Sequence, residues 1–495
     1  MASLLSFLLF SQMAAAVSKG PLYDSFVSLS IELTGFPSFA GTKESPNQFS
    51  YNLIKALADA QGSPLVIRVG GNSADRAIYD ANQSEATASS CDADPEAILC
   101  IGKSFFDSYG AFPNGTTYSH NFNLAASNSS GYDTLRETVP LACDALRGQL
   151  NVWEVGNEPD LYRGKWRPSD WPAEDYEADW QNATDSLKTY LQDACADMAA
   201  NGSFSLMAPS VSSPGSGIKV TDIFNDGENS ENFVKQISVH NYMAGASSSG
   251  VTVQNTLMSH KAVANKLQSH VNLAESLSDV DADYILGEHN SLYGGGASGK
   301  SNVFGAGLWV LEFSAYAAST GFIKREHFHQ AVGSAYSAWL PVSKDSSDPQ
   351  TNPPYYGKLA AATFLANSST IEVKTIDLNG DADKDSGYGA YVNGTLQRVA
   401  LLNLREFSSS SGSDRGSQNY TISVNPNESW VVKRLTAPGA DVDTGVTFNG
   451  YSYEYGTLGL PTRDNSTSSD EKVTSDASGN LYVTVADSEA VIITK

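Results

Sequence analysis

Residues 153–159 read Trp-Glu-Val-Gly-Asn-Glu-Pro, and this is the most informative stretch of the chain. It begins as a buried strand, which proline stops directly after an Asn-Glu pair. In a parallel β/α barrel the active site lies at the carboxyl ends of the strands, where a side chain faces the substrate from a rigid mount. Glu158 is therefore predicted to be one half of a catalytic pair. The alternative is a solvated or helix-capping glutamate, the usual role of an acidic residue beside a strand.

A later stretch of the same form supplies a partner for Glu158. Residues 283–290 read Asp-Tyr-Ile-Leu-Gly-Glu-His-Asn, so Glu288 also follows an apolar strand. Two carboxylates at facing strand ends suit glycoside hydrolysis, in which one protonates the leaving oxygen and the other attacks or activates water. We assign Glu158 as the acid/base and Glu288 as the nucleophile. Their pKa values must then differ, because Glu158 has to hold a proton while Glu288 stays ionised.

The length and composition describe a large globular protein. The chain has 495 residues, of which 41% are hydrophobic and 17% charged, which suits a large barrel with a smaller companion domain. A formal charge of -24 and a pI near 4.6 argue against nucleic acid or an anionic membrane as partner. No segment beyond the N-terminal one is apolar for long enough to span a bilayer. An anionic substrate would have to be held by local hydrogen-bond donors.

Short β-rich runs alternate with helical stretches through residues 17–367, the pattern of β/α units around a parallel sheet. Apolar residues recur at a helical period after Leu53, Leu187 and Val263. These features predict a (β/α)8 TIM barrel. Residues 368–495 instead carry alternating runs between Gly, Ser, Asp and Asn clusters and predict an all-β domain. The eight candidate barrel strands begin near Phe26, Leu65, Tyr118, Leu150, Phe204, Ile237, Tyr284 and Phe322.

The N-terminus is typical of a secretory signal peptide. Residues 1–16 combine an apolar run with a small-residue end at Ala14–Ala16. No Lys or Arg precedes the run, so an apolar first helix is the alternative. The density of Asn-X-Ser/Thr triplets supports a secreted, extracellular glycoprotein. They are headed by Asn82, Asn114, Asn128, Asn182, Asn201, Asn367, Asn393, Asn419, Asn427 and Asn465.

The chain has four cysteines, which fit an oxidising compartment and allow three pairings. The short span from Cys91 to Cys100 suits a disulfide within one loop. Cys143 and Cys195 would then form a second disulfide that joins two helices. Four free buried thiols are the alternative. The spacing matches no zinc motif, and we expect neither a metal nor a cofactor.

Polar residues beside the two glutamates suit a sugar site. Asn157 is well placed to hydrogen-bond a sugar hydroxyl, a contact that strengthens in the oxocarbenium-like transition state. Tyr242 ends the sixth predicted strand, where its hydroxyl would stabilise the anionic form of Glu288.

These motifs carry a family resemblance. Gly156-Asn157-Glu158-Pro159 resembles the acid/base motif of the retaining (β/α)8 glycosidase clan, His240-X-Tyr242 resembles its sixth-strand pattern, and Glu288 matches its nucleophile. Within the clan, residues 287–296 are most similar to glycoside hydrolase family 79, the fungal-type β-glucuronidases related to heparanase. The resemblance implies that the domain over residues 368–495 is a β-sandwich.

The resemblance also implies how the substrate carboxylate is held. In such enzymes a tyrosine and a backbone amide after the nucleophile bind it, which here are Tyr293 and Gly295, with Tyr336 contributing from the eighth-strand loop. Neutral donors in a desolvated pocket can bind a carboxylate without a basic surface. A plain flexible glycine loop is the alternative for residues 294–296.

Other polar residues at strand ends receive supporting roles. Glu32 resembles the family residue that binds sugar hydroxyls, with a structural ion pair as the alternative. We expect Arg68 and Asn72 to orient Glu288 rather than to contact sugar. His327 and His329 are interpreted as structural histidines.

Aromatic residues leave two readings open. Trp339 could stack on a sugar face or pack in the core. Trp166 and Trp171 follow the acid/base and could line the aglycone side.

The sequence thus predicts a secreted retaining exo-β-glucuronidase that removes terminal glucuronic acid, or its 4-O-methyl form, from glycans. Its partner would be a glycan or glycoside containing glucuronic acid. A heparanase-like endo-glucuronidase and a neutral-sugar glycosidase of the same clan are the alternative enzymes. A non-catalytic carbohydrate-binding wall protein is the alternative of another class, and the intact Glu158 and Glu288 argue against it.

Overall fold

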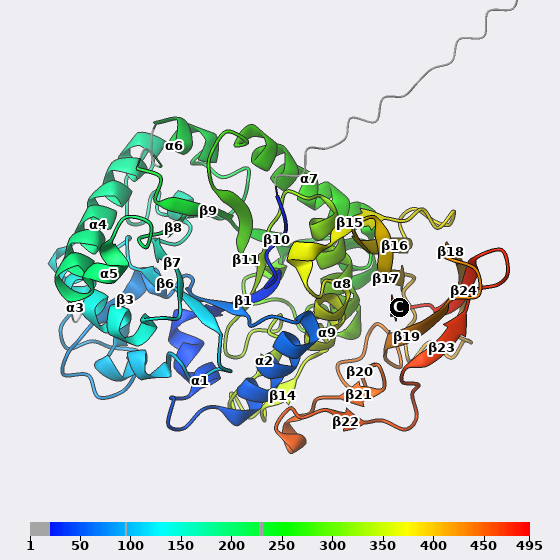
Figure 1. The fold of residues 1–495 in the computed structure, drawn as a ribbon. Coiled ribbons are helices and arrows are strands. Elements are labelled where there is room, and N and C mark those ends of the chain that lie inside the picture. Colours follow the sequence, from blue (N-terminus) through cyan, green and yellow to red (C-terminus); the bar gives the residue numbers. More distant parts are fainter. Residues whose placement is uncertain (1–19, 95–96, 227–228, 230) are drawn as a thin grey trace, which may run out of the picture.

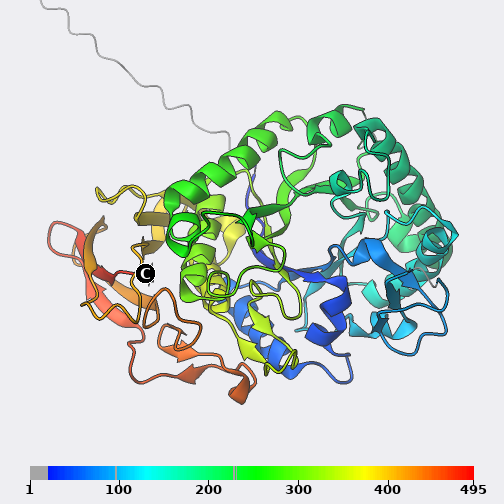
Figure 2. The same cartoon turned by 180° about the vertical axis from the view of Figure 1, so that it is seen from behind.

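The structure is a computed structural model and describes residues 20–94, 97–226, 229 and 231–495. The predicted signal peptide, residues 1–16, lies outside these ranges. A barrel drawn in blue to yellow lies beside an all-β part drawn in gold to red (Figures 1 and 2). Within the described ranges, no helix combines the length and apolar character that a membrane crossing needs.

The first part is a closed barrel of parallel strands, as the sequence predicts. Closure is shown by the pairing of β12 with β1 at one side and of β9 with β11 at the other. β9 and β10 lie on either side of His240 and share one position, so the described barrel has eight positions. The strands are β1 (Val27–Glu32), β2 (Val66–Gly70), β6 (Thr117–Phe122), β7 (Leu150–Val155), β8 (Leu206–Val211), β9 (Val234–Val239), β10 (Asn241–Gly245), β11 (Asp283–Tyr293) and β12 (Glu326–Gln330).

The eighth strand begins later than predicted. The sequence places its start near Phe322, whereas β12 begins at Glu326. The Lys324 ammonium donates to the carbonyl oxygens of Gly20 and Gly321, 2.8 Å from each. Residues 323–325 therefore belong to no strand, although they have the composition of one.

Helices surround the barrel because each buries one apolar face against the strands. In α2, Leu53, Ile54 and Leu57 are buried, and in α7, Val263 and Leu267 are buried. These are the residues whose spacing predicts the helices. The helices are α1 (Phe36–Ala40), α2 (Gln48–Gln61), α3 (Ser129–Leu146), α4 (Ala173–Ala194), α5 (Ala196–Ala199), α6 (Val220–Asp226), α7 (His260–Ser276), α8 (Phe304–Ser319) and α9 (Pro353–Phe364).

The C-terminal part is a β-sandwich, which confirms the predicted second fold. Its large sheet has the order β15-β16-β17-β25-β19-β20-β21-β22, β23 pairs with β19, and β18 pairs with β24 in a second sheet. The strands are β15 (Glu372–Thr375), β16 (Asp385–Val392), β17 (Thr395–Asn403), β18 (Ser417–Ser423), β19 (Ser429–Thr436), β20 (Thr447–Phe448), β21 (Tyr451–Ser452), β22 (Thr462–Arg463), β23 (Glu471–Thr474), β24 (Asn480–Ala486) and β25 (Glu489–Thr494).

The large sheet is buried on both faces. Val399 and Leu401 of β17 pack in the sandwich core, while Ala400 and Leu402 of the same strand belong to the core cluster shared with the barrel. Alternation along a strand sends successive side chains to opposite faces. The sheet thus covers α8 and α9, which explains why α8 is buried along nearly its whole length.

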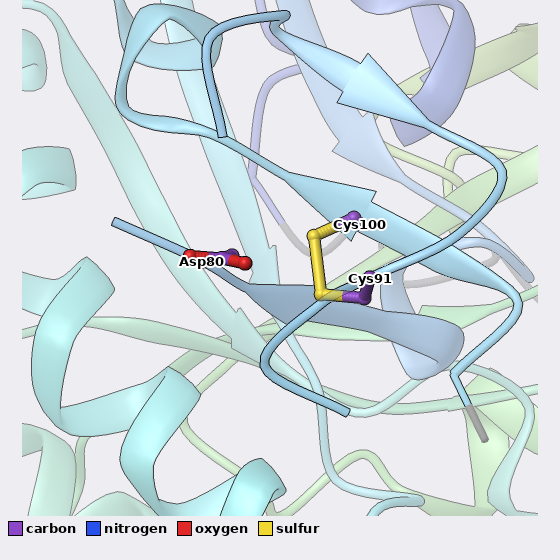
Figure 3. A group of neighbouring side chains, drawn as sticks. All are labelled: Asp80, Cys91 and Cys100. Carbon is purple, nitrogen blue, oxygen red and sulfur yellow. A yellow bond between two sulfur atoms is a disulfide. The ribbon is translucent and has the colours of Figure 1, made fainter. Parts of the chain in front are cut away.

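Both disulfides join the cysteines that the sequence pairs. Cys91 bonds to Cys100, and Cys143 in α3 bonds to Cys195, which follows α4. The first bond fastens the loop after β2, where β3 (Ala77–Tyr79), β4 (Thr87–Ala88) and β5 (Leu99–Ile101) form a small sheet. Figure 3 shows this bond beside Asp80, whose carboxylate accepts the backbone N–H groups of residues 82 and 93.

Candidate active site

Glu158 and Glu288 meet in a cavity at the carboxyl ends of the barrel strands. The cavity has a volume of about 750 Å³, and both glutamates line it. A carboxylate oxygen of Glu158 lies within 4.8 Å of one of Glu288, although the residues are far apart in the chain. The structure therefore brings the two predicted catalytic carboxylates together.

The backbone at Glu158 is unusual. Glu158 follows β7 and has φ of 46° and ψ of 55°, the left-handed region that residues other than glycine seldom occupy. Its N–H donates to the carbonyl oxygen of Ser210 at 2.9 Å, which holds this conformation. Two residues earlier, Gly156 has φ of 83°, and a Cβ there would meet the side chain of Leu124 at 2.9 Å. The strained turn directs the Glu158 carboxylate into the cavity.

Burial keeps Glu158 protonated. Burial raises the pKa of Glu158 well above its usual range, and the negative charges of Glu288 and Asp160 raise it further. His240 Nδ1 lies 3.0 Å from Glu158 Oε1, and burial lowers the pKa of His240 to about 4. His240 is therefore neutral near pH 7 and gives Glu158 a hydrogen-bond partner without a compensating positive charge.

The surroundings of Glu288 favour its ionised form, whereas those of Glu158 favour the protonated form. Burial opposes the ionisation of Glu288, but the positive charges of His329 and Arg68 and the hydroxyl of Tyr242 outweigh burial and lower its pKa below the usual range. Tyr242 donates to Glu288 Oε1 at 2.8 Å, and Arg68 donates to Glu288 Oε2 at 2.7 Å. Glu288 is thus held as an anion beside a protonated Glu158.

Arg68 connects several residues of the site. Its fully buried guanidinium donates to both carboxylate oxygens of Glu154, at 2.7 and 2.9 Å, and to Asn157 Oδ1 at 2.7 Å. A planar guanidinium with several fixed donors suits such a junction. Together with its bond to Glu288, these contacts fit the predicted role in orienting the nucleophile.

Asn157 is buried and is not among the residues that line the cavity. Its oxygen is taken by Arg68, while its buried Nδ2 has no hydrogen-bond partner among the described residues. Its backbone N–H donates to Asp75 Oδ2 at 3.1 Å, and the Tyr162 hydroxyl donates to the same oxygen at 2.6 Å. Asp75 and Tyr162 thus fix the position of Asn157, and its predicted contact with a sugar hydroxyl stays a prediction.

His329 does more than the structural role that the sequence predicts for it. Its Nε2 lies 3.1 Å from Glu32 Oε2 and its Nδ1 lies 3.6 Å from Glu288 Oε2, and all three residues line the cavity. Burial lowers the pKa of His329, but Glu288 and Glu32 outweigh burial and raise it. The prediction missed this because the pairing joins β1, β11 and β12, which are distant in the chain.

The loops after β11 and β12 form the opposite wall. Tyr293, Gly295 and Tyr336 all line the cavity, as the resemblance implies. Gly294, Gly295 and Gly296 have φ values of 81°, 85° and 77°, so this turn requires glycine. The Ala335 N–H donates to the Gly295 carbonyl oxygen at 2.7 Å and ties the two loops. The glycines therefore form a defined turn.

Asn72 and Trp339 lie elsewhere than the predicted roles require. Asn72 is exposed on the cavity wall, and none of the described hydrogen bonds joins it to Glu288, so it does not orient the nucleophile. The described donors to Glu288 are Arg68 and Tyr242. Trp339 is fully buried and donates to Ser50 Oγ at 2.9 Å, which settles its reading as core packing.

The two tryptophans after the acid/base also lie outside the cavity. Trp171 is buried and stacks on the Tyr162 ring, with 6.0 Å between ring centroids. Trp166 is half-buried beneath the Lys165 ammonium, 3.6 Å from the ring centre. Neither residue lines the cavity that holds the glutamate pair.

The sequence analysis did not identify two buried acidic residues of the site, Glu154 and Asp75. Glu154 binds Arg68 and also accepts from Ser210 Oγ at 2.6 Å. Asp75 accepts a hydrogen bond from the backbone N–H of Asn157. A charged residue inside the apolar strand at 150–155 is the signal that could have revealed Glu154, because a charge is rarely buried without a partner.

Glu158, His240 and Glu288 place potential metal-ligand atoms within 4.8 Å of one another. The Arg68 guanidinium already neutralises Glu288 at 2.7 Å, and a divalent cation there would be repelled by it. We therefore interpret these residues as an acid–base pair with a supporting histidine.

Known proteins share both parts of the chain. Residues 387–492 match the glycosyl hydrolase family 79 C-terminal beta domain. The chain is 38% identical over 499 residues to a β-glucuronidase of Aspergillus niger, covering 96% of this chain and 91% of that protein. It is 36% identical over 482 residues to a β-glucuronidase of Neurospora crassa, covering 88% of this chain and 86% of that protein.

Solved structures share the fold. A 4-O-α-L-rhamnosyl-β-D-glucuronidase of Fusarium oxysporum superposes with a TM-score of 0.77 at 23% identity, covering 96% of this chain and 97% of that one. A family 51 arabinofuranosidase of Xanthomonas axonopodis superposes with a TM-score of 0.58 at 14% identity, covering 96% and 98%. The identities to the two curated relatives and the matching C-terminal domain show that this chain is a glycoside hydrolase and belongs to glycosyl hydrolase family 79.

Proposed function

We propose that the protein is a secreted, retaining β-glucuronidase that removes terminal glucuronic acid, or its 4-O-methyl form, from glycans. The observation that carries the mechanism is the separation of the two catalytic carboxylates, whose nearest oxygens lie within 4.8 Å. Retaining enzymes hold their carboxyl groups about 5–5.5 Å apart, whereas inverting enzymes leave about 6.5–9.5 Å for a water.

The geometry supports a double displacement. The Glu288 carboxylate forms a bond to the anomeric carbon while Glu158 gives its proton to the glycosidic oxygen, and the bond from the anomeric carbon to that oxygen breaks. Glu158, now ionised, takes a proton from water as the water attacks the glycosyl-enzyme and frees Glu288. The burial of Glu158 and the pairing of Glu288 with Arg68 and Tyr242 suit these roles.

The choice of a glucuronyl unit rests on the relatives and on the cavity wall. Both curated relatives are β-glucuronidases. The Tyr293 and Tyr336 rings lie 6.3 and 6.2 Å from the Tyr242 ring, so three phenols gather beside Glu288. Phenol hydroxyls and backbone N–H groups of the turn at Gly295 are neutral donors that can bind a carboxylate. Such donors suit a protein with a formal charge of -24, which does not attract anions over long distances.

A panel of p-nitrophenyl glycosides tests the activity. We expect cleavage of the β-D-glucuronide and slow or no cleavage of the β-D-galactoside and β-D-xyloside, with β-glucuronic acid as the first product in proton NMR. Preferential cleavage of a neutral glycoside would overturn the substrate assignment, and α-glucuronic acid as the first product would overturn retention. A protein that binds the glucuronide but releases no p-nitrophenol would be a binding protein.

The pH dependence follows from the two pKa directions. Because the pKa of Glu158 is raised, kcat/KM should fall as pH rises through a value above that of an ordinary glutamate. Because the pKa of Glu288 is lowered, activity should fall on the acid side only below the ordinary value. A profile of kcat/KM against pH checks both limbs, and Glu158→Ala should abolish the alkaline limb. An alkaline limb that persists in this variant would contradict the assignment.

Tyr242→Phe should weaken the nucleophile without unfolding the site. It removes the 2.8 Å donor to Glu288, so kcat/KM should fall by about tenfold to a hundredfold, the scale of a hydrogen bond to a charged group. The pKa of Glu288 should rise, so the acid limb should move to higher pH. Tyr132→Phe, at a tyrosine that is 63% exposed, is the matched control. An unmoved acid limb would show that Tyr242 does not stabilise the Glu288 anion.

Secretion is supported by both disulfides and by the density of glycosylation triplets. Expression in a secreting, glycosylating host tests it. We expect an extracellular glycoprotein whose N-terminus begins near Val17. An intracellular protein that retains Met1 would contradict this part of the proposal.

A further inference from the structure

Ser210 interrupts the regular pairing of β8 with β9. The pairing advances by two residues in β8, from Pro209 to Val211, while it advances by one residue in β9, so Ser210 is an extra residue in its strand. Ser210 has φ of 54°, in the left-handed region, and it is almost fully buried. Such a bulge redirects a side chain, and glycine adopts its left-handed conformation with the least strain. A serine at this position therefore indicates that the side chain itself has a role.

The Ser210 hydroxyl binds the carboxylate that holds Arg68. It donates to Glu154 Oε1 at 2.6 Å, and the same oxygen accepts from Arg68 Nη2 at 2.9 Å. The other Glu154 oxygen accepts from Arg68 Nε at 2.7 Å. All three side chains are buried, so water does not compete for these hydrogen bonds. Hydrogen bonds to ionised groups in such surroundings are strong.

Arg68 connects this carboxylate to the nucleophile. Its Nη1 donates to Glu288 Oε2 at 2.7 Å, from the same planar guanidinium whose other N–H groups bind Glu154. Because the guanidinium is rigid, fixing it at Glu154 also fixes the direction of the donor that faces Glu288. The Ser210 hydroxyl is thus linked to the nucleophile through two residues.

Two further contacts place Ser210 between the catalytic glutamates. Its carbonyl oxygen accepts the N–H of Glu158 at 2.9 Å. Its hydroxyl lies 2.9 Å from Ser238 Oγ, and that oxygen fills the space beside Gly287, where an added Cβ would clash with it. Gly287 directly precedes Glu288 in the chain. Ser210 therefore lies where the backbone around both glutamates is fixed.

We propose that Ser210 is a positioning residue for the nucleophile Glu288. Its hydroxyl orients Glu154, and Glu154 in turn holds Arg68 in contact with Glu288. The bulge in β8 brings this hydroxyl to Glu154. The inference rests on the proposed double displacement and adds to it a residue that does not line the catalytic cavity.

Ser210→Ala tests the role of the hydroxyl. The variant keeps the Cβ and the carbonyl oxygen that accepts from Glu158, and it loses the donor to Glu154. We expect kcat/KM for p-nitrophenyl β-D-glucuronide to fall by about tenfold, the scale of one hydrogen bond to a charged group. The acid limb of the pH profile should move to higher pH, because a less tightly held Arg68 stabilises the Glu288 anion less.

The other titratable groups that act directly on Glu288 are unchanged in this variant. They are Tyr242 on β10, His240 between β9 and β10, His329 on β12, Tyr336 after β12 and Glu158 after β7. A shift of the acid limb therefore reports on the contact between Arg68 and Glu288. An acid limb that stays at the parent position would overturn the inference.

Ser488→Ala is the matched control. Ser488 lies between β24 and β25 in the β-sandwich, is fully buried and has φ of 55°. Its hydroxyl also makes two hydrogen bonds, to the Arg405 carbonyl oxygen at 2.9 Å and from the Phe407 N–H at 2.8 Å. We expect both variants to melt within about a few degrees of the parent, with kcat/KM lowered only in Ser210→Ala. Equal kinetic losses in the two variants would show a general effect of removing a buried hydroxyl.

A double-mutant cycle with Glu154→Gln tests the route of the effect. Glu154→Gln alone should lower kcat/KM by more than Ser210→Ala does, because Arg68 loses a charged partner. In that background Ser210→Ala should change kcat/KM by less than about twofold, because the hydroxyl no longer binds a carboxylate that holds Arg68. Losses that multiply would show that the hydroxyl acts by another route and would contradict the inference.

The outcomes distinguish this inference from the proposed function. If the parent protein cleaves the glucuronide and Ser210→Ala behaves as Ser488→Ala does, the inference is wrong while the glucuronidase proposal stands. If the parent cleaves only another glycoside, the glucuronidase proposal fails. The same variants are then compared on that glycoside, because the inference concerns the nucleophile and not the identity of the sugar.

Discussion

Glu288→Ala should lower kcat for p-nitrophenyl β-D-glucuronide by about four orders of magnitude or more, the scale of losing a catalytic nucleophile. Without the carboxylate no covalent intermediate can form, and water has no positioned base on that face of the sugar. The truncation also leaves a space beside Arg68 and Tyr242, which now have no anion between them. Steady-state kinetics with freshly purified variant protein measures the loss.

That space supplies a second readout for the same variant. A small anion such as azide should enter it, attack the anomeric carbon and restore turnover with an α-glucuronyl azide as product. A structural role for Glu288 would give no such rescue. Glu288→Gln keeps the shape of the side chain and serves as the folding control, with an unchanged melting temperature within a few degrees. A β-configured azide, or activity near that of the wild type, would refute the assignment of the nucleophile.

Glu158→Ala should have an effect that depends on the leaving group. General acid catalysis contributes about a hundredfold to ten-thousandfold, and a leaving group that departs without a proton does not need it. We therefore expect kcat/KM for a dinitrophenyl glucuronide to fall by less than about tenfold, and for an unactivated glucuronyl glycan to fall by about a thousandfold. Parallel assays of the two substrates measure the difference.

The second step of the reaction gives an independent check. Glu158 also activates water as the base, so the variant should accumulate glycosyl-enzyme on Glu288 when the leaving group is good. A burst of dinitrophenol and a mass shift on the peptide that carries Glu288 would show this. Asp160→Asn removes a neighbouring negative charge without removing the acid, and it should only lower the pKa of the alkaline limb. Equal losses for both leaving groups would contradict the role of Glu158.

Strand positions and the meeting of Glu158 and Glu288 could be predicted from sequence because their signals are local. The run before Glu158 and the run before Glu288 each show a strand and its end within a few residues. Parallel strands in a barrel place their carboxyl ends at one mouth, so two local observations predict a meeting in space. The start of β12 could not be predicted in the same way, because residues 322–325 have the same strand-like composition as the strand that follows them.

The roles of residues whose partners lie on other strands could be recognised only in the folded structure. Nothing in the sequence around His329 indicates that it lies between Glu32 and Glu288, and nothing near Asn72 indicates that Arg68 fills the position beside the nucleophile. The buried acids Glu154 and Asp75 acquire their partners from other strands and loops.

The sequence alone determined the barrel, the all-β domain after it and the pair of glutamates, since apolar periodicity and strand-end motifs are properties of contiguous residues. Tertiary structure alone decided which glutamate is buried beside a neutral histidine and which is paired with a cation. The physical reason is that a pKa depends on burial and on charges within a few ångströms. Those neighbours come from strands separated by many residues, and only folding brings them together.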